Sequence, residues 1–170
     1  VYTACTEIDH IFAGEAESSI VRFFQDVLGG GEPERHISAE VPDLQGLPSP
    51  YLDGSLLLSN YSGALWEFSR GCPFRCSFCY EARGSKALRR FPRARLQQEL
   101  AAFQQAGIQN VMVLDPTFNY HKKQAKELLN MLVDSQSDIH FNFEIRAEFL
   151  DEEMADLFAQ LSCSIQIGLQ

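Results

Sequence analysis

Three cysteines within eight residues form the clearest chemical pattern in this sequence. Cys72, Cys76 and Cys79 are separated by three and then two residues, in the run GCPFRCSFCY that covers residues 71–80. The other two cysteines, Cys5 and Cys163, stand alone. An odd total of five cysteines and the close spacing of three of them favour a metal site over a disulfide framework.

The donor set suits an iron–sulfur cluster better than a zinc ion. A structural zinc site usually takes four ligands in two pairs, whereas the four histidines are scattered singly, at His10, His36, His121 and His140. Three thiolates on a short loop can reach three corners of a 4Fe–4S cube, and full ligation by protein takes four cysteines. The fourth iron then keeps an open coordination position, which catalysis at a metal requires.

The cysteine loop and its surroundings resemble the signature of the radical S-adenosylmethionine (radical SAM) superfamily. Phe78 precedes the last cysteine, and WEFSRG at 66–71 is similar to the strand and turn before this loop in members with an upstream cobalamin-binding domain. The resemblance implies a 4Fe–4S cluster on Cys72, Cys76 and Cys79, with S-adenosylmethionine (SAM) bound at the open iron. One electron from the cluster would split SAM into methionine and a 5′-deoxyadenosyl radical, for hydrogen abstraction from, or methylation of, an unknown substrate.

Strands and helices are expected to alternate from residue 61 onward. Short apolar runs predict strands at 64–68, 110–114, 140–145 and 164–169, and helical spacing predicts helices at about 92–106, 120–134 and 152–161. Asp151 is the expected N-cap of the third of these helices. Strand and helix alternating at roughly thirty residues per unit predict an α/β fold of parallel βα repeats.

The resemblance also implies how the chain is divided. The superfamily core resembles a partial (β/α)6 barrel, of which this sequence supplies about four units, so we expect the sequence to be cut at both ends. Residues 1–30, with GEAE at 14–17 and a helix at 13–28, are expected to be the C-terminal tail of a cobalamin-binding-like domain. Residues 31–60, rich in proline and glycine, are expected to be a linker, and residues 61–170 the first portion of the radical SAM core.

Polar residues follow the second strand, at the carboxyl end where parallel βα folds bind ligands. By their position in the superfamily, Asp115 and Thr117 are expected to contact the amino group of SAM, although the usual Gly-Gly-Glu sequence is absent. Alternatively, Asp115 starts a turn and Asn119 caps the next helix. The resemblance places Phe78 and Tyr80 beside the adenine of SAM, Phe78 chiefly through its backbone.

Polar residues also close the third strand and occupy the fourth. Relatives place contacts to the ribose and to the methionine carboxylate where Glu144 and Arg146 occur. We expect Arg146 to pair with a carboxylate such as that of the substrate, in preference to a salt bridge with Glu148. Gln166 is expected either to point into the barrel or to satisfy a backbone group.

Composition and charge argue against two classes of protein. No apolar run approaches the roughly 18–20 residues that cross a bilayer, so a membrane-spanning protein is not expected. The net charge is −9, but residues 70–95 hold eight basic side chains and one acidic, which is +7 and leaves −16 for the rest. An acidic body argues against a broad nucleic-acid-binding face, while the basic stretch can offset an anionic cluster.

The resemblance implies a small-molecule substrate, an electron donor such as flavodoxin or ferredoxin, and a cytoplasmic location. It also raises cobalamin as a cofactor, held by an upstream domain, although the Asp-x-His-x-x-Gly pattern for a cobalt ligand does not occur in the sequence. Two alternatives stay open. One is a non-enzymatic iron–sulfur or zinc module, and the other is an RNA-modifying methylthiotransferase built on the same core.

Overall fold

The computed structural model describes residues 7–80 and 86–168 and divides into two compact units, Val1–Leu47 and Pro48–Gln170. The division falls inside the segment 31–60, which was expected to be a linker. Among the described residues, no helix combines the length and the apolar character needed to cross a membrane.

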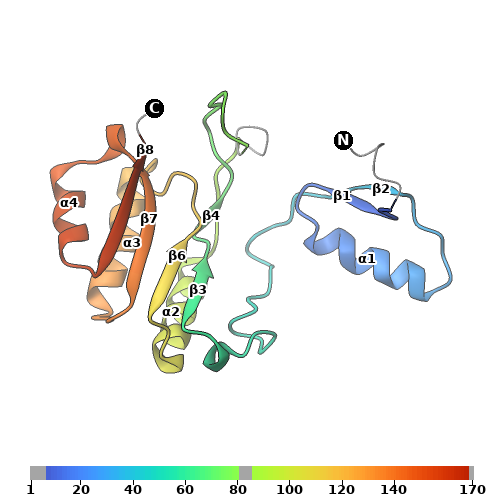
Figure 1. Cartoon of the computed structure of the whole chain (residues 1–170), viewed down its shortest axis with the longest axis horizontal. Coiled ribbons are helices and arrows are strands. Elements are labelled where there is room, and N and C mark those ends of the chain that lie inside the picture. The colour runs from blue at the N-terminus through green and yellow to red at the C-terminus, as the bar shows by residue number, and fades with distance from the viewer. Residues whose placement is uncertain (1–6, 81–85, 169–170) are drawn as a thin grey trace. The chain divides into compact units, whose positions relative to one another are not determined.

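Unit 1 is a single βαβ crossover. Strand β1 (Ile11–Ala13) pairs in parallel with β2 (His36–Ser38), and helix α1 (Glu17–Leu28) connects them (Figure 1). The helix begins four residues later than the sequence predicted, because Gly14 has a φ of +111°, which lies outside the helical region. Strand β2 lies within the expected linker, where the count of prolines and glycines obscured a strand of three residues.

Unit 2 holds a four-stranded parallel sheet with the strand order β3-β6-β7-β8. The strands are β3 (Gly63–Trp66), β6 (Asn110–Val113), β7 (His140–Arg146) and β8 (Cys163–Gly168). The three helices that join them are α2 (Arg93–Ala106), α3 (Lys122–Asp134) and α4 (Glu152–Ala159). The predicted α/β fold of parallel βα repeats is confirmed.

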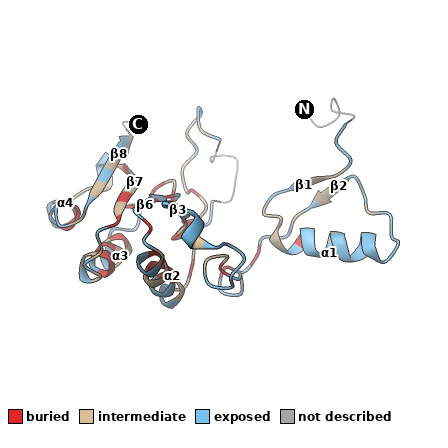
Figure 2. Ribbon diagram, turned by 60° about the horizontal axis from the view of Figure 1, so that its bottom comes forward, coloured by how far each residue is buried: buried red, intermediate tan, exposed pale blue. Residues whose placement is uncertain are grey.

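All three helices of unit 2 lie on one face of the sheet (Figure 2). The core between sheet and helices is built from large side chains with almost no exposure, among them Trp66, Phe103, Val111, Leu129 and Phe141. The other face of the sheet is open: the Leu65 side chain is 58% exposed and that of Met112 is 42% exposed. Because successive residues of a strand point to opposite faces, polar residues of β7 and β8 share this open face.

Two short 3-10 helices lie next to strands of the sheet. A short 3-10 helix, η1 (Leu58–Asn60), precedes β3, and a second, η3 (Ala147–Phe149), follows β7. The Asp151 carboxylate accepts a hydrogen bond of 3.1 Å from the Met154 backbone N–H, so the predicted N-cap of α4 is confirmed.

Candidate functional site

The cysteine loop leaves the sheet at the carboxyl end of β3 and is closed at its base by a small antiparallel sheet. Strand β4 (Ser69–Arg70), which Figure 1 labels, pairs with β5 (Arg89–Arg90). The Phe91 backbone N–H donates to the Phe68 carbonyl at 3.0 Å and extends this pairing. The sequence predicted one continuous strand at 64–68, because a two-residue strand has no period that a pattern can show.

Asp115 holds the turn that leads from β3 into the cysteine loop. Its buried carboxylate accepts hydrogen bonds from the backbone N–H of Phe68 at 2.7 Å, the backbone N–H of Ser69 at 3.1 Å and the Ser69 hydroxyl at 2.5 Å. Burial raises the pKa of Asp115 to about 6, against the lowering effect of these hydrogen bonds. Both carboxylate oxygens therefore serve the turn, a role that the sequence did not suggest.

Thr117 lies against the first cysteine. Its Oγ1 is 3.7 Å from the Sγ of Cys72, and both side chains are buried. The next residue, Phe118, fixes this segment to the core, since its ring packs against those of Phe68 at 5.8 Å and Phe143 at 4.9 Å. The structure thus brings a residue expected at SAM to a cysteine forty-five positions earlier in the chain.

Asn119 joins the segment after β6 to the end of β7. Its fully buried amide donates to the Arg146 carbonyl at 2.8 Å and accepts from the Arg146 backbone N–H at 3.0 Å. The alternative role as a helix cap is wrong, because α3 begins at Lys122 with His121 as its N-cap residue. No local pattern in the sequence indicates this role, because the backbone that Asn119 binds lies twenty-seven positions further along the chain.

Arg146 lies over the middle of the cysteine loop. Its Nε donates to Glu148 Oε1 at 2.6 Å, and its Nη1 lies 3.8 Å from the Sγ of Cys76. The structure therefore contains the alternative salt bridge with Glu148, because η3 turns Glu148 back toward the end of β7, and the pairing of Arg146 with a substrate carboxylate stays a prediction. Burial lowers the pKa of Arg146, but the hydrogen bonds to Glu148 and Cys76 more than offset it, so the net pKa is raised.

Phe74 anchors the loop between its first two cysteines. The Arg146 guanidinium lies 3.9 Å from the centre of the Phe74 ring, a cation–π distance. The Phe74 ring also contacts Tyr120 at 5.4 Å and Phe149 at 5.9 Å, which come from the segments after β6 and β7. This aromatic cluster leaves no pattern in the sequence, since its members are far apart along the chain.

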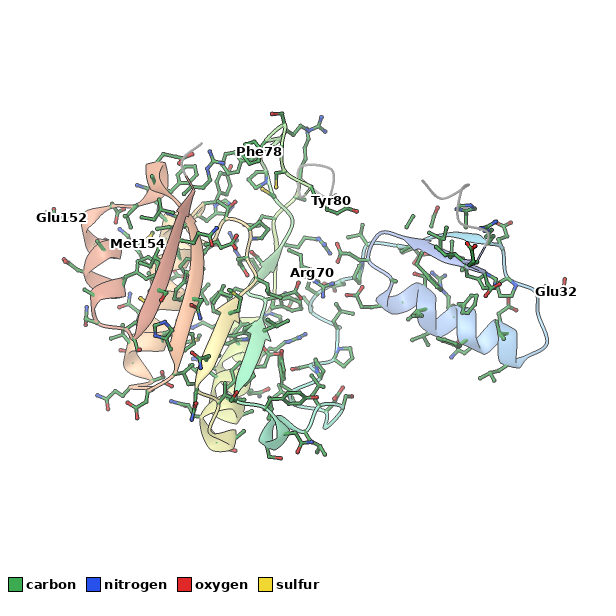
Figure 3. The ribbon with its side chains drawn as sticks, viewed as in Figure 1. Glu32, Arg70, Phe78, Tyr80, Glu152 and Met154 are labelled. Carbon is green, nitrogen blue, oxygen red and sulfur yellow. The ribbon has the colours of Figure 1, made fainter. Side chains whose placement is uncertain are left out.

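The second half of the loop faces outward. The side chains of Phe78 and Tyr80 are 77% and 79% exposed and flank Cys79 (Figure 3). The Cys79 backbone N–H donates to the Cys76 carbonyl at 3.1 Å and closes a turn between the two cysteines. Two exposed aromatic faces therefore stand beside the last cysteine.

Glu144 and Gln166 lie on the open face of the sheet. They are directly paired in the register of β7 and β8, and both are exposed. Their neighbours Phe143 and Ile145 are buried on the helical side. Two polar side chains therefore stand together near the carboxyl end of the sheet.

The cysteines of the described chain are free thiols: Cys72, Cys76, Cys79 and Cys163. Within residues 7–80 and 86–168, no three His, Cys, Asp or Glu side chains gather closely enough to hold a single metal ion. A 4Fe–4S cluster does not need such a gathering, because each thiolate binds a different iron at a separate corner.

Comparison with known proteins assigns residues 66–170 to the family described as the Radical SAM superfamily. The cobalamin-dependent radical SAM methyltransferase TokK of Streptomyces tokunonensis is 30% identical over 118 residues, which is 64% of this chain and 17% of that protein. An uncharacterized methyltransferase of Synechocystis sp. is 32% identical over 161 residues, 89% of this chain and 30% of that protein. A 2-(S-pantetheinyl)-carbapenam-3-carboxylate methyltransferase of Streptantibioticus cattleyicolor is 33% identical over 99 residues, 53% of this chain and 14% of that protein.

Solved structures share the fold. The radical SAM methyltransferase TsrM of Kitasatospora setae, with tryptophan and a SAM analogue bound, matches with a TM-score of 0.69 at 20% identity, over 91% of this chain and 36% of that chain. The cobalamin-dependent SAM radical enzyme OxsB with aqua-cobalamin matches with a TM-score of 0.65 at 20% identity, over 92% of this chain and 27% of that chain. The chain therefore spans less than two fifths of any of the proteins named here.

Proposed function

This chain belongs to the radical SAM superfamily, and from that premise we propose that it holds a 4Fe–4S cluster on Cys72, Cys76 and Cys79 and cleaves SAM. One observation carries the proposal. Three free thiols share one loop at the carboxyl end of a parallel sheet, and two of them already contact Thr117 and Arg146 from neighbouring loops. A cluster with an open iron would supply the one-electron chemistry when SAM is bound.

The chain's own residues fit such a cluster. Hydrogen bonds to Asp115 hold the start of the loop, and ring contacts of Phe74 hold its middle. The segment that carries the cysteines is therefore packed against the rest of unit 2. Arg146, together with the eight basic residues between 70 and 95, can offset the negative charge of three thiolates. Asp115 meets the turn with both oxygens, so we assign it to positioning the loop, in place of the SAM contact expected for it.

We assign the SAM and substrate contacts to the exposed side chains. Phe78 and Tyr80 present aromatic faces beside Cys79, on which an adenine can stack. Glu144 offers a carboxylate where the family resemblance places ribose contacts, and Gln166, its partner in the register of β7 and β8, offers an amide on the same open face of the sheet. We assign the open face of the sheet, which carries Leu65, Glu144 and Gln166, to binding of a small-molecule substrate.

Methyl transfer is the reaction we propose. The three relatives compared by sequence are described as methyltransferases, and one of these three, TokK, is described as cobalamin-dependent. We propose that residues 1–30 belong to a cobalamin-binding-like domain and that cobalamin is the second cofactor. The βαβ crossover of unit 1 suits the end of an α/β domain, and the matched region of OxsB extends well into unit 1, since it covers 92% of this chain.

Partners and location follow from the same chemistry. The proposed cluster needs an external electron, so we propose a donor such as flavodoxin or ferredoxin and a cytoplasmic site of action. A small molecule is favoured over RNA as substrate, because the chain outside residues 70–95 has a net charge of −16, which repels phosphates. The basic stretch is accounted for by the anionic cluster.

Anaerobic reconstitution tests the proposal. The chain is loaded with iron and sulfide, purified, and supplied with dithionite and SAM, and iron content and 5′-deoxyadenosine are measured. We expect about four irons per chain, formation of 5′-deoxyadenosine, and loss of both in Cys76→Ala. The matched control is Cys163→Ala, since this thiol lies outside the loop and contacts the Phe158 carbonyl at 3.5 Å.

The outcomes separate the alternatives. Stoichiometric zinc with no adenosyl product would identify a zinc module, and four irons in both wild type and Cys76→Ala would remove Cys76 from the ligand set. Four irons with no SAM cleavage in the complete protein would identify an electron-transfer module.

A further inference from the structure

We propose that Thr117 and Arg146 act on the cluster's sulfur ligands, each donating a hydrogen bond to one thiolate and so raising the reduction potential of the cluster. Their positions in the sequence suggested contacts to SAM, whereas the structure places them against Cys72 and Cys76. The inference rests on the proposed function, because it concerns the cluster assigned there.

Thr117 can serve only as a donor once Cys72 is a ligand. In the free thiol either the sulfur or Oγ1 could donate across their 3.7 Å separation. A ligating cysteine is a thiolate without a proton, so the hydroxyl of Thr117 must supply the hydrogen. The hydroxyl is held in place because Thr117 is 4% exposed and its carbonyl accepts from the Tyr120 backbone N–H at 3.2 Å.

Arg146 is a donor under all conditions, because a guanidinium remains protonated in proteins. Its Nη1 reaches the Sγ of Cys76 at 3.8 Å. Three contacts fix that direction: Phe74 lies beneath the guanidinium at 3.9 Å, Glu148 accepts from Nε at 2.6 Å, and Asn119 binds the backbone of Arg146 on both sides. The side chain is only 14% exposed, so water screens its charge weakly.

Hydrogen bonds to sulfur and nearby positive charge favour the reduced cluster, which carries one more negative charge than the oxidised cluster. Thr117 contributes a neutral donor and Arg146 a charged one, so Arg146 should have the larger effect. Glu148 works in the opposite direction, because its carboxylate offsets part of the charge of Arg146. Substituting any of these three side chains should therefore shift the reduction potential of the cluster in a direction that can be stated in advance.

The test is a redox titration of the anaerobically reconstituted chain, followed by EPR without SAM. Arg146→Gln should lower the ratio of reduced to oxidised cluster at a fixed potential by roughly tenfold, a shift of about 59 mV for one electron. Thr117→Val, which keeps the shape and removes the hydroxyl, should shift the potential in the same direction by less. Arg146→Lys and Thr117→Ser should restore part of the shift, and Glu148→Gln should move the potential upward.

Potentials of Arg146→Gln and Thr117→Val equal to that of the wild type, with iron content unchanged, would overturn the inference and leave the proposed function intact. A wild-type chain that binds no cluster would overturn the proposed function first. Should Arg146→Gln fail to retain iron, Thr117→Val and Glu148→Gln decide the matter. Opposite shifts in these two variants support the inference, and no shift in either overturns it.

Discussion

The carboxylate of Asp115 is buried. It accepts three hydrogen bonds, from the backbone N–H groups of Phe68 and Ser69 and from the Ser69 hydroxyl. Burial raises the pKa of Asp115 by more than the three hydrogen bonds lower it, so the pKa is about 6 instead of the ordinary 3.8. Folding therefore favours the protonated form of Asp115. Its contribution to stability is present below pH 3.8 and is lost as pH rises through about 6.

Asp115→Asn should remove this pH dependence, since the amide mimics the neutral acid. The free energy of unfolding of the wild type, relative to that of Asp115→Asn, should fall by up to about 3 kcal/mol between pH 4 and pH 7. Urea titrations followed by the fluorescence of Trp66, the only tryptophan in the sequence, measure it.

Asp53→Asn is the matched control for the Asp115 variant. Hydrogen bonds from Ser55 lower the pKa of the exposed Asp53 carboxyl below 3.8, so its stabilising effect is present above pH 3.8 and is lost only as pH falls through its folded pKa. Between pH 4 and pH 7 the difference in the free energy of unfolding between the wild type and Asp53→Asn should therefore stay constant. A constant difference between the wild type and Asp115→Asn over the same range would contradict the role given to Asp115.

At the scale of elements, α2 is joined to β3 through one buried carboxylate. Glu99, 1% exposed, accepts from Trp66 Nε1 at 2.7 Å, from the Ser49 hydroxyl at 2.5 Å and from Arg95 Nε at 2.8 Å. Tyr51 adds a second link, because its hydroxyl donates to the Leu65 carbonyl. The segment that enters unit 2, the helix and the strand before the cysteine loop are therefore held together at one point.

Glu99→Ala should destabilise unit 2 by about 3–5 kcal/mol, because it removes the acceptor of the Trp66 indole and the Ser49 hydroxyl and breaks the ion pair between Glu99 and Arg95. Urea titration with fluorescence detection measures the loss, and the emission of Trp66 should shift in the folded state. The control is Gln98→Ala, one residue away on the exposed side of α2. Its free energy of unfolding should differ from that of the wild type by no more than about 0.5 kcal/mol. Equal effects of the two substitutions would show that the Glu99 contacts contribute no stability.

At the scale of the molecule, the two units differ in how much core supports them. Strands β6 and β7 have a neighbour on both sides, and Val111 and Phe141 are 0% exposed. Unit 1 has a two-stranded sheet, and its helix α1 leaves Val21 and Phe24 more than half exposed. Unit 1 should therefore open more readily than unit 2.

Hydrogen exchange of the whole chain, read by mass spectrometry, checks this difference. Peptides from β6 and β7 should exchange slowest, and peptides from α1 and β2 should exchange through openings of lower free energy. Both sets come from one sample, so each serves as the control for the other. Equal protection of the two units would contradict the expectation and indicate that unit 1 is supported as firmly as the sheet.

Most of the fold of unit 2 was accessible from the sequence, because apolar periodicity and helix caps act between residues close along the chain. The four strands, the three helices and the cap at Asp151 were predicted within a few residues. The strands β1, β2, β4 and β5 were missed, since two or three residues are too few for a period. The helix α1 was predicted too long, because the backbone at Gly14 does not follow from composition.

The cysteine motif could be predicted from the sequence alone, because three cysteines at a fixed spacing on one loop remain neighbours however the chain folds. The side chains that contact those sulfurs could not be predicted in this way. Thr117 reaches Cys72 across forty-five residues and Arg146 reaches Cys76 across seventy. Such contacts depend on the order and register of parallel strands, which bring the loops after β3, β6 and β7 to one edge of the sheet.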